Sequence, residues 1–289
     1  MTERKRLIVS ADDFGMSPGV NAAIVEAHRD GILTDASLMV SGAAADEAVE
    51  LARAVPRLSV GLHLVLAQGR ATLPPRTIPD LVDGDGFFRN QPIRAALGYF
   101  FTPGVRAQVQ REVEAQIEKF LATGLPLSHV DGHVNIHMHP TIVNILLAVA
   151  DRYGIRALRL TREPLRMALR LNREHAPRKV AEGLTFSALS AYARPRIGAR
   201  NLSCPDRLFG LHQSGHITEV YLSQLLSLLT QGVTELYCHP AHLDDEARRW
   251  RPPDYESEAE LRALTSPRIA EQIRALGIEL MSYRDLASG

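Results

Sequence analysis

The sequence predicts an α/β protein in which seven to eight parallel strands and their connecting helices form a single irregular, TIM-like (β/α) barrel. Short apolar runs of strand length alternate with helical patterns along the chain, an order that favours parallel strands. No Gly- or Ser-rich linker and no internal repeat interrupts this order, so we expect one domain over residues 1–289. Hydrophobic residues make up 45% of the chain, which is enough apolar material for one large core.

The first half of the chain contains strand candidates at residues 7–10, 36–40, 58–62 and 127–131. Helices are expected between them over residues 18–30, 44–54 and 105–121. Ser17 is a suitable N-cap for the first helix, because Pro18 then occupies the first helical position. From Val105 to Leu121 an apolar residue returns every four positions, as on the buried face of an amphipathic helix.

The second half repeats the pattern, with strand candidates at residues 157–160, 234–238 and 278–281. A short run at Leu208 and Phe209 would make an eighth strand. Helices are expected over residues 141–153, 219–229 and 257–276. Two excursions break the alternation, near residues 70–91 and 162–215. The second overlaps the basic stretch 156–207, which holds twelve Lys and Arg against four Asp and Glu.

Composition excludes several classes of protein. Lys+Arg and Asp+Glu are both 33, and a chain without net charge is not a typical nucleic-acid binder. Two cysteines, Cys204 and Cys238, are too few for a disulfide framework, which is typical of a reducing compartment. No apolar run approaches the roughly 20 residues that span a bilayer, and no secretory signal is recognisable. We therefore expect a cytoplasmic protein.

Acidic and histidine side chains stand where the predicted strands end. Asp12 and Asp13 follow the first strand, His63 follows the third, and His239 follows the strand at 234–238. Four of the eleven histidines lie within residues 129–139, at the end of another strand candidate. Because the carboxyl ends of the strands form the catalytic face of a (β/α) barrel, we expect these side chains to meet there.

One Asp and two His from different strand ends would form a metal site with open positions, the arrangement of catalytic rather than structural sites. Such a cation lowers the pKa of bound water and polarises a carbonyl group. The donor set favours zinc over magnesium, but the sequence indicates only a divalent cation, Zn or Mg. Each residue also has a structural interpretation, as a helix cap, a packed core histidine or a surface loop, and spacing alone does not say which His binds.

The chain resembles the YdjC-like family of carbohydrate deacetylases. The matching motifs follow the family order over most of the chain: SADDFG at residues 10–15, GLH at 61–63, the cluster at 129–140 and HPA at 239–241. The resemblance implies an irregular (β/α) barrel, one divalent cation and removal of acetyl groups from N-acetylated sugars.

Carried over by motif, the resemblance also implies roles for individual residues. It makes Asp13, His63 and His133 the metal ligands and Asp12 the general base. It makes His239 the candidate general acid. The remaining candidates are contacts to substrate or support for the site: Phe14, His129 and His137.

Within that family the chain is most similar to deacetylases associated with hopanoid biosynthesis, on motifs such as those at residues 37–40, 99–103 and 161–164. This implies an N-acetylglucosamine headgroup on a hopanoid lipid as substrate, giving the free amine and acetate. A lipid substrate implies peripheral contact with the inner membrane face, for which the basic stretch 156–207 and the aromatic residues 99–101 are candidates.

The sequence leaves other functions open. One is an N-deacetylase of soluble chitooligosaccharides, and another is a phosphoesterase-type metal hydrolase on the same ligands. A non-catalytic sugar- or lipid-binding module is the third alternative. No nucleic-acid partner is expected, whereas a homodimer is compatible with the sequence.

Overall fold

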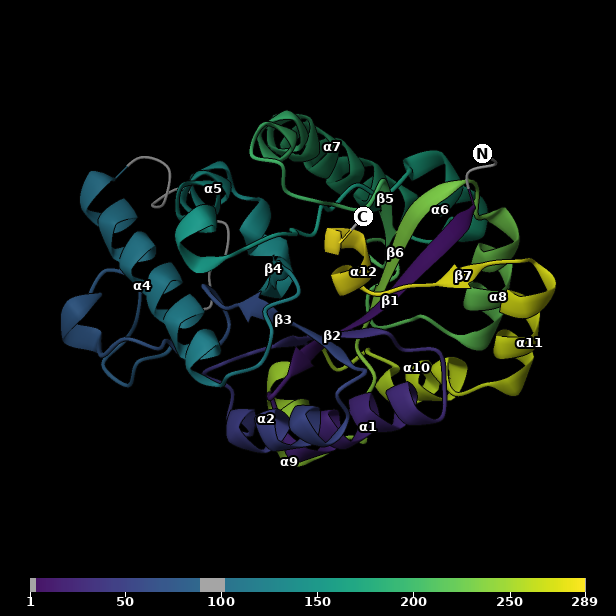
Figure 1. The fold of residues 1–289 in the computed structure, drawn as a ribbon, viewed down its shortest axis with the longest axis horizontal. Coiled ribbons are helices and arrows are strands. Elements are labelled where there is room, and N and C mark those ends of the chain that lie inside the picture. The colour runs from purple at the N-terminus through teal and green to yellow at the C-terminus, as the bar shows by residue number, and fades with distance from the viewer. Residues whose placement is uncertain (1–3, 89–101, 289) are drawn as a thin grey trace.

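The computed structural model describes residues 4–88 and 102–288, and its centre is a parallel β-sheet curled into a half-barrel (Figure 1). The strands are β1 (Lys5–Phe14), β2 (Asp35–Leu38), β3 (Ser59–Leu64), β4 (Val130–Gly132), β5 (Arg207–Phe209), β6 (Gly232–Cys238) and β7 (Glu279–Leu280). Their order is β4-β3-β2-β1-β6-β5, and β7 pairs with the start of β1. Every paired neighbour is parallel, so the predicted (β/α) barrel-like fold is confirmed.

The prediction of a strand at residues 157–160 is wrong. This segment forms isolated β-bridges instead of a continuous ladder of strand pairing. On one side Val130 N donates to Ala157 O at 3.1 Å, and Arg159 N donates to Val130 O at 3.1 Å. On the other side Leu158 N donates to Ser203 O at 3.0 Å. The segment thus connects the β4 edge of the sheet to the chain that leads into β5, and the barrel is irregular at this point.

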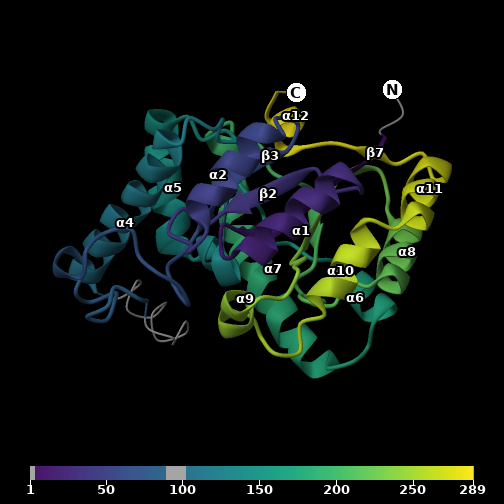
Figure 2. The same cartoon turned by 90° about the horizontal axis from the view of Figure 1, so that it is seen from below.

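Helices surround the sheet (Figures 1 and 2). They are α1 (Pro18–Arg29), α2 (Ala45–Ala54), α4 (Pro103–Ala122), α5 (Pro140–Tyr153), α6 (Leu165–Leu171), α7 (Ala176–Ala199), α8 (Glu219–Leu228), α9 (Asp245–Trp250), α10 (Ser257–Leu264), α11 (Pro267–Ala275) and α12 (Tyr283–Ser288), with the 3₁₀ segments η1 (Pro75–Thr77) and η2 (His133–Met138). Ser17 caps α1 as predicted, since its side chain accepts from Val20 N at 3.2 Å.

Two helical regions differ from the prediction. The single helix expected over residues 257–276 is two helices, because the ring of Pro267 lacks an N–H and starts a new helix, α11. The basic stretch 156–207 contains the 24-residue helix α7, which the apolar pattern did not indicate. Its buried face includes Gly183, Ser190 and Ala193, so the apolar stripe that marks an amphipathic helix is weak.

No helix in the described ranges has both the length and the hydropathy that crossing a bilayer requires. The aromatic residues 99–101, which the sequence indicates as candidates for membrane contact, lie outside the described residues.

Gly61 in β3 allows two strands to approach each other below the carboxyl face. A Cβ at this position would lie 2.4 Å from the His129 ring and 2.7 Å from the His129 carbonyl oxygen. His129 is itself fully buried, between the hydroxyls of Ser37 and Ser128. The missing side chain of Gly61 is therefore a packing requirement of the sheet.

We predict that Gly61→Ala destabilises the protein by about 1–3 kcal/mol, because the added methyl group displaces a buried ring and backbone. Denaturant unfolding followed by circular dichroism measures the change. The matched control is Gly198→Ala in α7, where the Cβ meets nothing within 4 Å and should stabilise the helix by about 0.5–1 kcal/mol. Equal effects of the two substitutions would contradict the packing argument.

Candidate metal centre and active site

The strand ends bring five of the predicted residues into one cavity of about 80 Å³. Asp12 and Asp13 lie at the end of β1, and His63 is the penultimate residue of β3. His133 begins η2 directly after β4, and His239 follows β6. All five line the cavity, so the expected convergence at the carboxyl ends of the strands is present in the structure.

The two adjacent aspartates both face the cavity because the end of β1 is irregular. Successive side chains of a regular strand point to opposite faces of the sheet. Here the pairing register with β2 shifts between Ala11 and Phe14, and Asp13 has a left-handed backbone with φ of 68°. An aspartate tolerates this conformation better than most residues. The irregularity turns Asp13 toward the same space as Asp12.

Asp13, His63 and His133 form a compact set of ligand atoms. Asp13 Oδ1 lies 3.1 Å from His133 Nδ1 and 3.6 Å from His63 Nε2. One ligand atom from each of the three residues lies within 4.8 Å of the others, which is the spacing of groups that share a cation. Asp13 and His63 are almost fully buried, and His133 is partly exposed. One carboxylate and two imidazoles with an open side fit a catalytic divalent cation.

A second acidic residue orients the His63 ring. His63 Nδ1 lies 2.8 Å from Asp131 Oδ1, which leaves Nε2 directed toward Asp13. A carboxylate behind the imidazole is the usual arrangement at metal-bound histidines. Burial lowers the pKa of His63, but the charges of Asp131 and Asp12 outweigh it and raise that pKa to about 9. The surroundings therefore favour positive charge at this point, which a proton on the ring or a bound cation would supply.

Asp12, His63 and Asp131 form a second set of clustered ligand atoms. Arg159 already supplies a cation there, since its guanidinium contacts Asp131 Oδ2 at 2.8 Å and both oxygens of Asp12 at 2.8 and 2.9 Å. The set that contains Asp13 is therefore the better candidate for a metal site.

Arg159 is the functional residue that sequence motifs missed. Its side chain is fully buried, and its Nε also donates to Glu235 Oε1 at 2.9 Å. One guanidinium thus holds three buried carboxylates, and its five donors in a planar fork suit this task. The available signal was a lone arginine inside the apolar strand candidate at residues 157–160.

His239 lies against two tyrosines on the β6 side of the cavity. The ring centroids of His239 and Tyr237 are 5.6 Å apart, and those of His239 and Tyr255 are 5.2 Å apart. Burial lowers the pKa of His239 to about 4, so the ring is neutral near pH 7. Its Nδ1 has no hydrogen-bond partner among the described residues. A neutral, unpaired nitrogen at this point is able to accept a proton and pass it on.

Arg251 links His239 to the ligand set. Its Nη1 donates to His239 O at 2.6 Å, and its Nη2 lies 3.4 Å from Asp13 Oδ2. It lines the cavity together with residues that no motif indicated, among them Gln68, Trp250 and Tyr255.

The other three predicted residues lie below the cavity rather than in its lining. Phe14 is fully buried in the core. His129 contacts Ser37 Oγ at 3.1 Å, and the same hydroxyl donates to Asp131 Oδ2 at 2.7 Å. His137 Nε2 lies 3.2 Å from the carbonyl oxygen of Arg159. Both histidines touch residues that support the ligands, while their contact with substrate remains a prediction.

The chain is similar to known proteins over nearly its whole length. The family model described as YdjC-like protein matches residues 6–275. The chain is 31% identical over 283 residues to a carbohydrate deacetylase of Brevibacillus brevis, covering 97% of this chain and 99% of the relative. It is 32% identical over 279 residues to a carbohydrate deacetylase of Geobacillus stearothermophilus, covering 96% of each.

A solved structure from Enterococcus faecalis has the same fold. It is named as a candidate cellobiose-phosphate cleavage protein, and it matches with a TM-score of 0.74 and 30% identity. The match covers 98% of this chain and 99% of that chain.

We predict that Arg159→Met destabilises the protein by about 3–5 kcal/mol, because three buried carboxylates lose their cation. Arg159→Lys should restore little, since one ammonium group cannot reproduce the planar fork. Thermal and denaturant unfolding measure both variants. As a control, Arg152→Ala removes an exposed ion pair with Glu114 and should cost less than about 1 kcal/mol. If Arg159→Met stayed within that control range, Arg159 would not be holding the carboxylates.

Proposed function

The chain belongs to the YdjC-like family, and from this membership and the geometry of its site we propose that it is a metal-dependent carbohydrate deacetylase. It hydrolyses the amide of an N-acetylated sugar to acetate and the free amine. The observation that carries the proposal is the single cavity that joins the ligand set Asp13, His63 and His133 to Asp12 and His239. These are the parts that hydrolysis of an amide requires: a cation site, a base and an acid.

We propose that Asp13, His63 and His133 hold one divalent cation, zinc or magnesium. When bound, the cation supplies Lewis-acid chemistry, polarising the acyl carbonyl and lowering the pKa of a water molecule. Asp131 keeps the His63 ring in the orientation that directs Nε2 toward the site. Arg251, at 3.4 Å from Asp13 Oδ2, restrains the carboxylate from the other side.

Asp12 acts as the general base. Arg159 holds both of its oxygens, so the carboxylate is fixed in position before substrate binds. A positioned base that removes the proton of the attacking water typically contributes about 10²- to 10⁴-fold to the rate. The hydroxyl adds to the acyl carbon as Asp12 takes this proton.

His239 delivers a proton to the departing nitrogen. The amine of a sugar is a poor leaving group unless it is protonated as the C–N bond breaks. His239 lines the same cavity as Asp12, and its buried Nδ1 is unpaired among the described residues. A ring that starts neutral first accepts the proton that Asp12 took from the water and then donates it to the nitrogen, which completes the addition of water across the amide bond.

A phosphoesterase on the same ligands is less well supported. Phosphate esters usually call for two metal ions or a clamp of arginines. Arg251 is the arginine that lines the described cavity, and its guanidinium is already committed to His239 O, Ser257 Oγ and Asp13.

We propose further that the sugar is the N-acetylglucosamine headgroup of a hopanoid lipid. Two features support this finer proposal: the motifs at residues 37–40 and 161–164, and the basic stretch 156–207. Within that stretch Arg166, Arg170 and Arg173 are exposed. Each basic residue near an anionic membrane surface contributes about 1 kcal/mol to binding. An N-deacetylase of soluble chitooligosaccharides is the alternative.

We predict that Asp12→Asn lowers turnover about 10²-fold or more with the metal still bound, because it removes the base and keeps the ligands. His133→Ala should instead lower both metal content and turnover. Release of the free amine from N-acetylglucosamine oligomers gives turnover, and elemental analysis gives the metal. Asp46→Asn, an exposed position in α2, is the matched control and should behave as wild type. Wild-type turnover of Asp12→Asn would refute the role of the base.

The lipid proposal predicts loss of one acetyl group when the metal-loaded enzyme is incubated with an N-acetylglucosaminyl hopanoid, detected by mass spectrometry. It also predicts flotation with anionic vesicles at low salt that disappears at high salt, because surface charges are screened. Replacing Arg166, Arg170 and Arg173 by Ala should weaken this flotation. Turnover of soluble oligomers with no vesicle binding at low salt would reject the membrane contact.

A further inference from the structure

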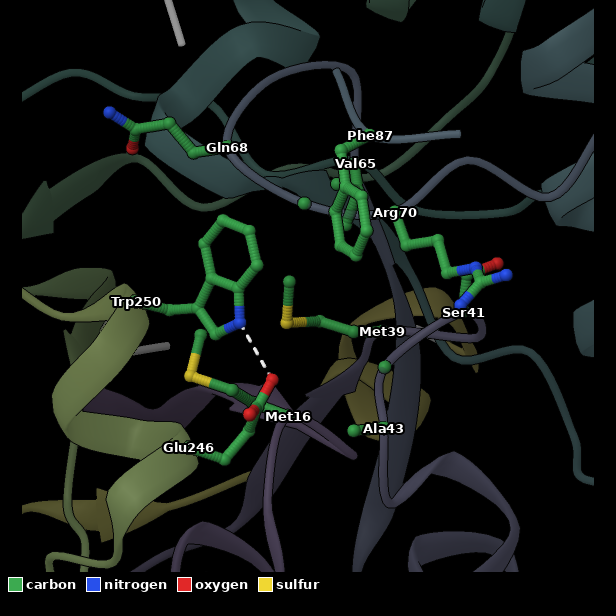
Figure 3. Close-up of a pocket in the computed structure, with 12 residues that line it drawn as sticks. Met16, Met39, Ser41, Ala43, Val65, Gln68, Arg70, Phe87, Glu246 and Trp250 are labelled. Atoms are coloured by element: carbon green, nitrogen blue, oxygen red, sulfur yellow. Dashed lines mark hydrogen bonds between the residues drawn. The ribbon is translucent and has the colours of Figure 1, made fainter. Parts of the chain in front are cut away.

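An apolar pocket of about 170 Å³ adjoins the candidate active site (Figure 3). It lies beyond the carboxyl ends of β1, β2 and β3, and its large apolar side chains are Met16, Met39, Val65, Phe87 and Trp250. Figure 3 shows the Trp250 indole and the thioethers of Met16 and Met39 directed into one space. Gln68 and Trp250 line both this pocket and the cavity that holds the ligand set, so the two spaces meet at these side chains.

A polar pocket adjoins the same cavity elsewhere. It has a volume of about 530 Å³ and shares Ser214, Pro252 and Tyr255 with the cavity, but no lining residue with the apolar pocket. Charged groups of both signs line it, including Arg178, Lys179, Glu182 and Glu256. Its four carboxylates outnumber its two basic side chains, and mixed donors and acceptors of this kind suit the hydroxyl groups of a sugar.

The position of His239 indicates how the scissile amide is oriented in the cavity. The His239 ring lies beside Tyr255, with ring centroids 5.2 Å apart, and Tyr255 is also part of the polar pocket. His239 protonates the amine nitrogen in the proposed mechanism, so the sugar that carries this nitrogen extends toward the polar pocket. The acyl group is on the other side of the C–N bond, where Gln68 and Trp250 line both the cavity and the apolar pocket.

We propose that the apolar pocket binds the acyl chain of the scissile amide, and that the enzyme hydrolyses N-acyl amino sugars with chains longer than acetyl. This inference rests on the proposed function. Water adds across the amide as before: the acyl carbon gains the hydroxyl and leaves as a carboxylate, and the nitrogen gains the proton as the C–N bond breaks. No further reactant is required.

The size and the lining of the pocket support this occupant. A cavity of about 150 Å³ holds a benzene molecule, so a pocket of about 170 Å³ has room for a chain several carbons longer than acetyl. The methionines that line it are flexible and adapt to chains of different length. Each methylene group that is buried in the pocket in the transition state multiplies kcat/KM by about four.

The test compares glucosamine carrying N-acetyl, N-butanoyl or N-hexanoyl groups with the metal-loaded full chain. Release of the free amine gives kcat/KM for each. We expect N-butanoyl glucosamine to react about fifteenfold faster than the N-acetyl compound in kcat/KM, from two added methylenes. Hydrolysis of the acetyl compound without hydrolysis of the two longer ones would overturn the inference and leave the proposed function standing. Failure with all three would reject both.

Ala43→Trp places a large side chain at the wall of the apolar pocket and should lower the ratio of hexanoyl to acetyl kcat/KM at least about tenfold, through loss of several buried methylenes. Both substrates are assayed on the same preparation, so a change in the folded fraction cancels from this ratio. Ala188→Trp on the exposed side of α7 is the matched control and should leave the ratio unchanged. An unchanged ratio in Ala43→Trp would count against the pocket.

Alkyl glycosides of N-acetylglucosamine separate the acyl chain from an apolar group elsewhere on the sugar. We expect a hexyl glycoside to react like the methyl glycoside. A gain with the hexyl glycoside that Ala43→Trp abolishes would show that the pocket takes the aglycone, and would overturn the assignment.

Discussion

Arg159 places one buried guanidinium among Asp12, Asp131 and Glu235, and the geometry of the site depends on this contact. Unpaired carboxylates in the interior would be costly. The positively charged guanidinium of Arg159 is therefore needed for these strands to hold buried acidic residues. The contact is also one part of a larger network of hydrogen bonds and ion pairs. Tyr283 from α12 donates to Glu235, Arg159 joins Glu235 to Asp131 and Asp12, and Asp131 orients His63. The proposed base, Asp12, and one proposed metal ligand, His63, are thereby held by the same network.

Backbone strain shapes the other side of the site. Asp13 has φ of 68°, and Val134 and Asn135 in η2 have φ of 49° and 56°. For a β-branched residue such as Val134 this conformation is rare and unfavourable. The strained residues stand at Asp13 itself and directly after His133, so the local conformations that cost free energy are those that turn two proposed ligands toward each other. The packed network beneath them offsets that cost.

The cavity has a polar pocket on one side and an apolar pocket on another. Ser214 and Tyr255 connect it to a polar pocket, whereas Gln68 and Trp250 connect it to an apolar one. An amide that lies across the cation site with its nitrogen near His239 presents its sugar to the first and its acyl group to the second. Specificity for the sugar and specificity for the acyl chain then reside in different elements, and substitutions in one need not alter the other.

The alternation of apolar runs determined the barrel, and the acidic and histidine residues after those runs determined which strand ends carry chemistry, because both are local properties of the chain. Arg159 shows where local reasoning ends: its role comes from carboxylates on β1, β4 and β6, brought together only by the fold. The same holds for helix α7, whose mostly small or polar buried residues give only a weak apolar stripe, and for Trp250, which reaches the cavity from α9. Side-chain type and spacing are written in the sequence, whereas which side chains share a charge or a pocket depends on contacts between distant segments.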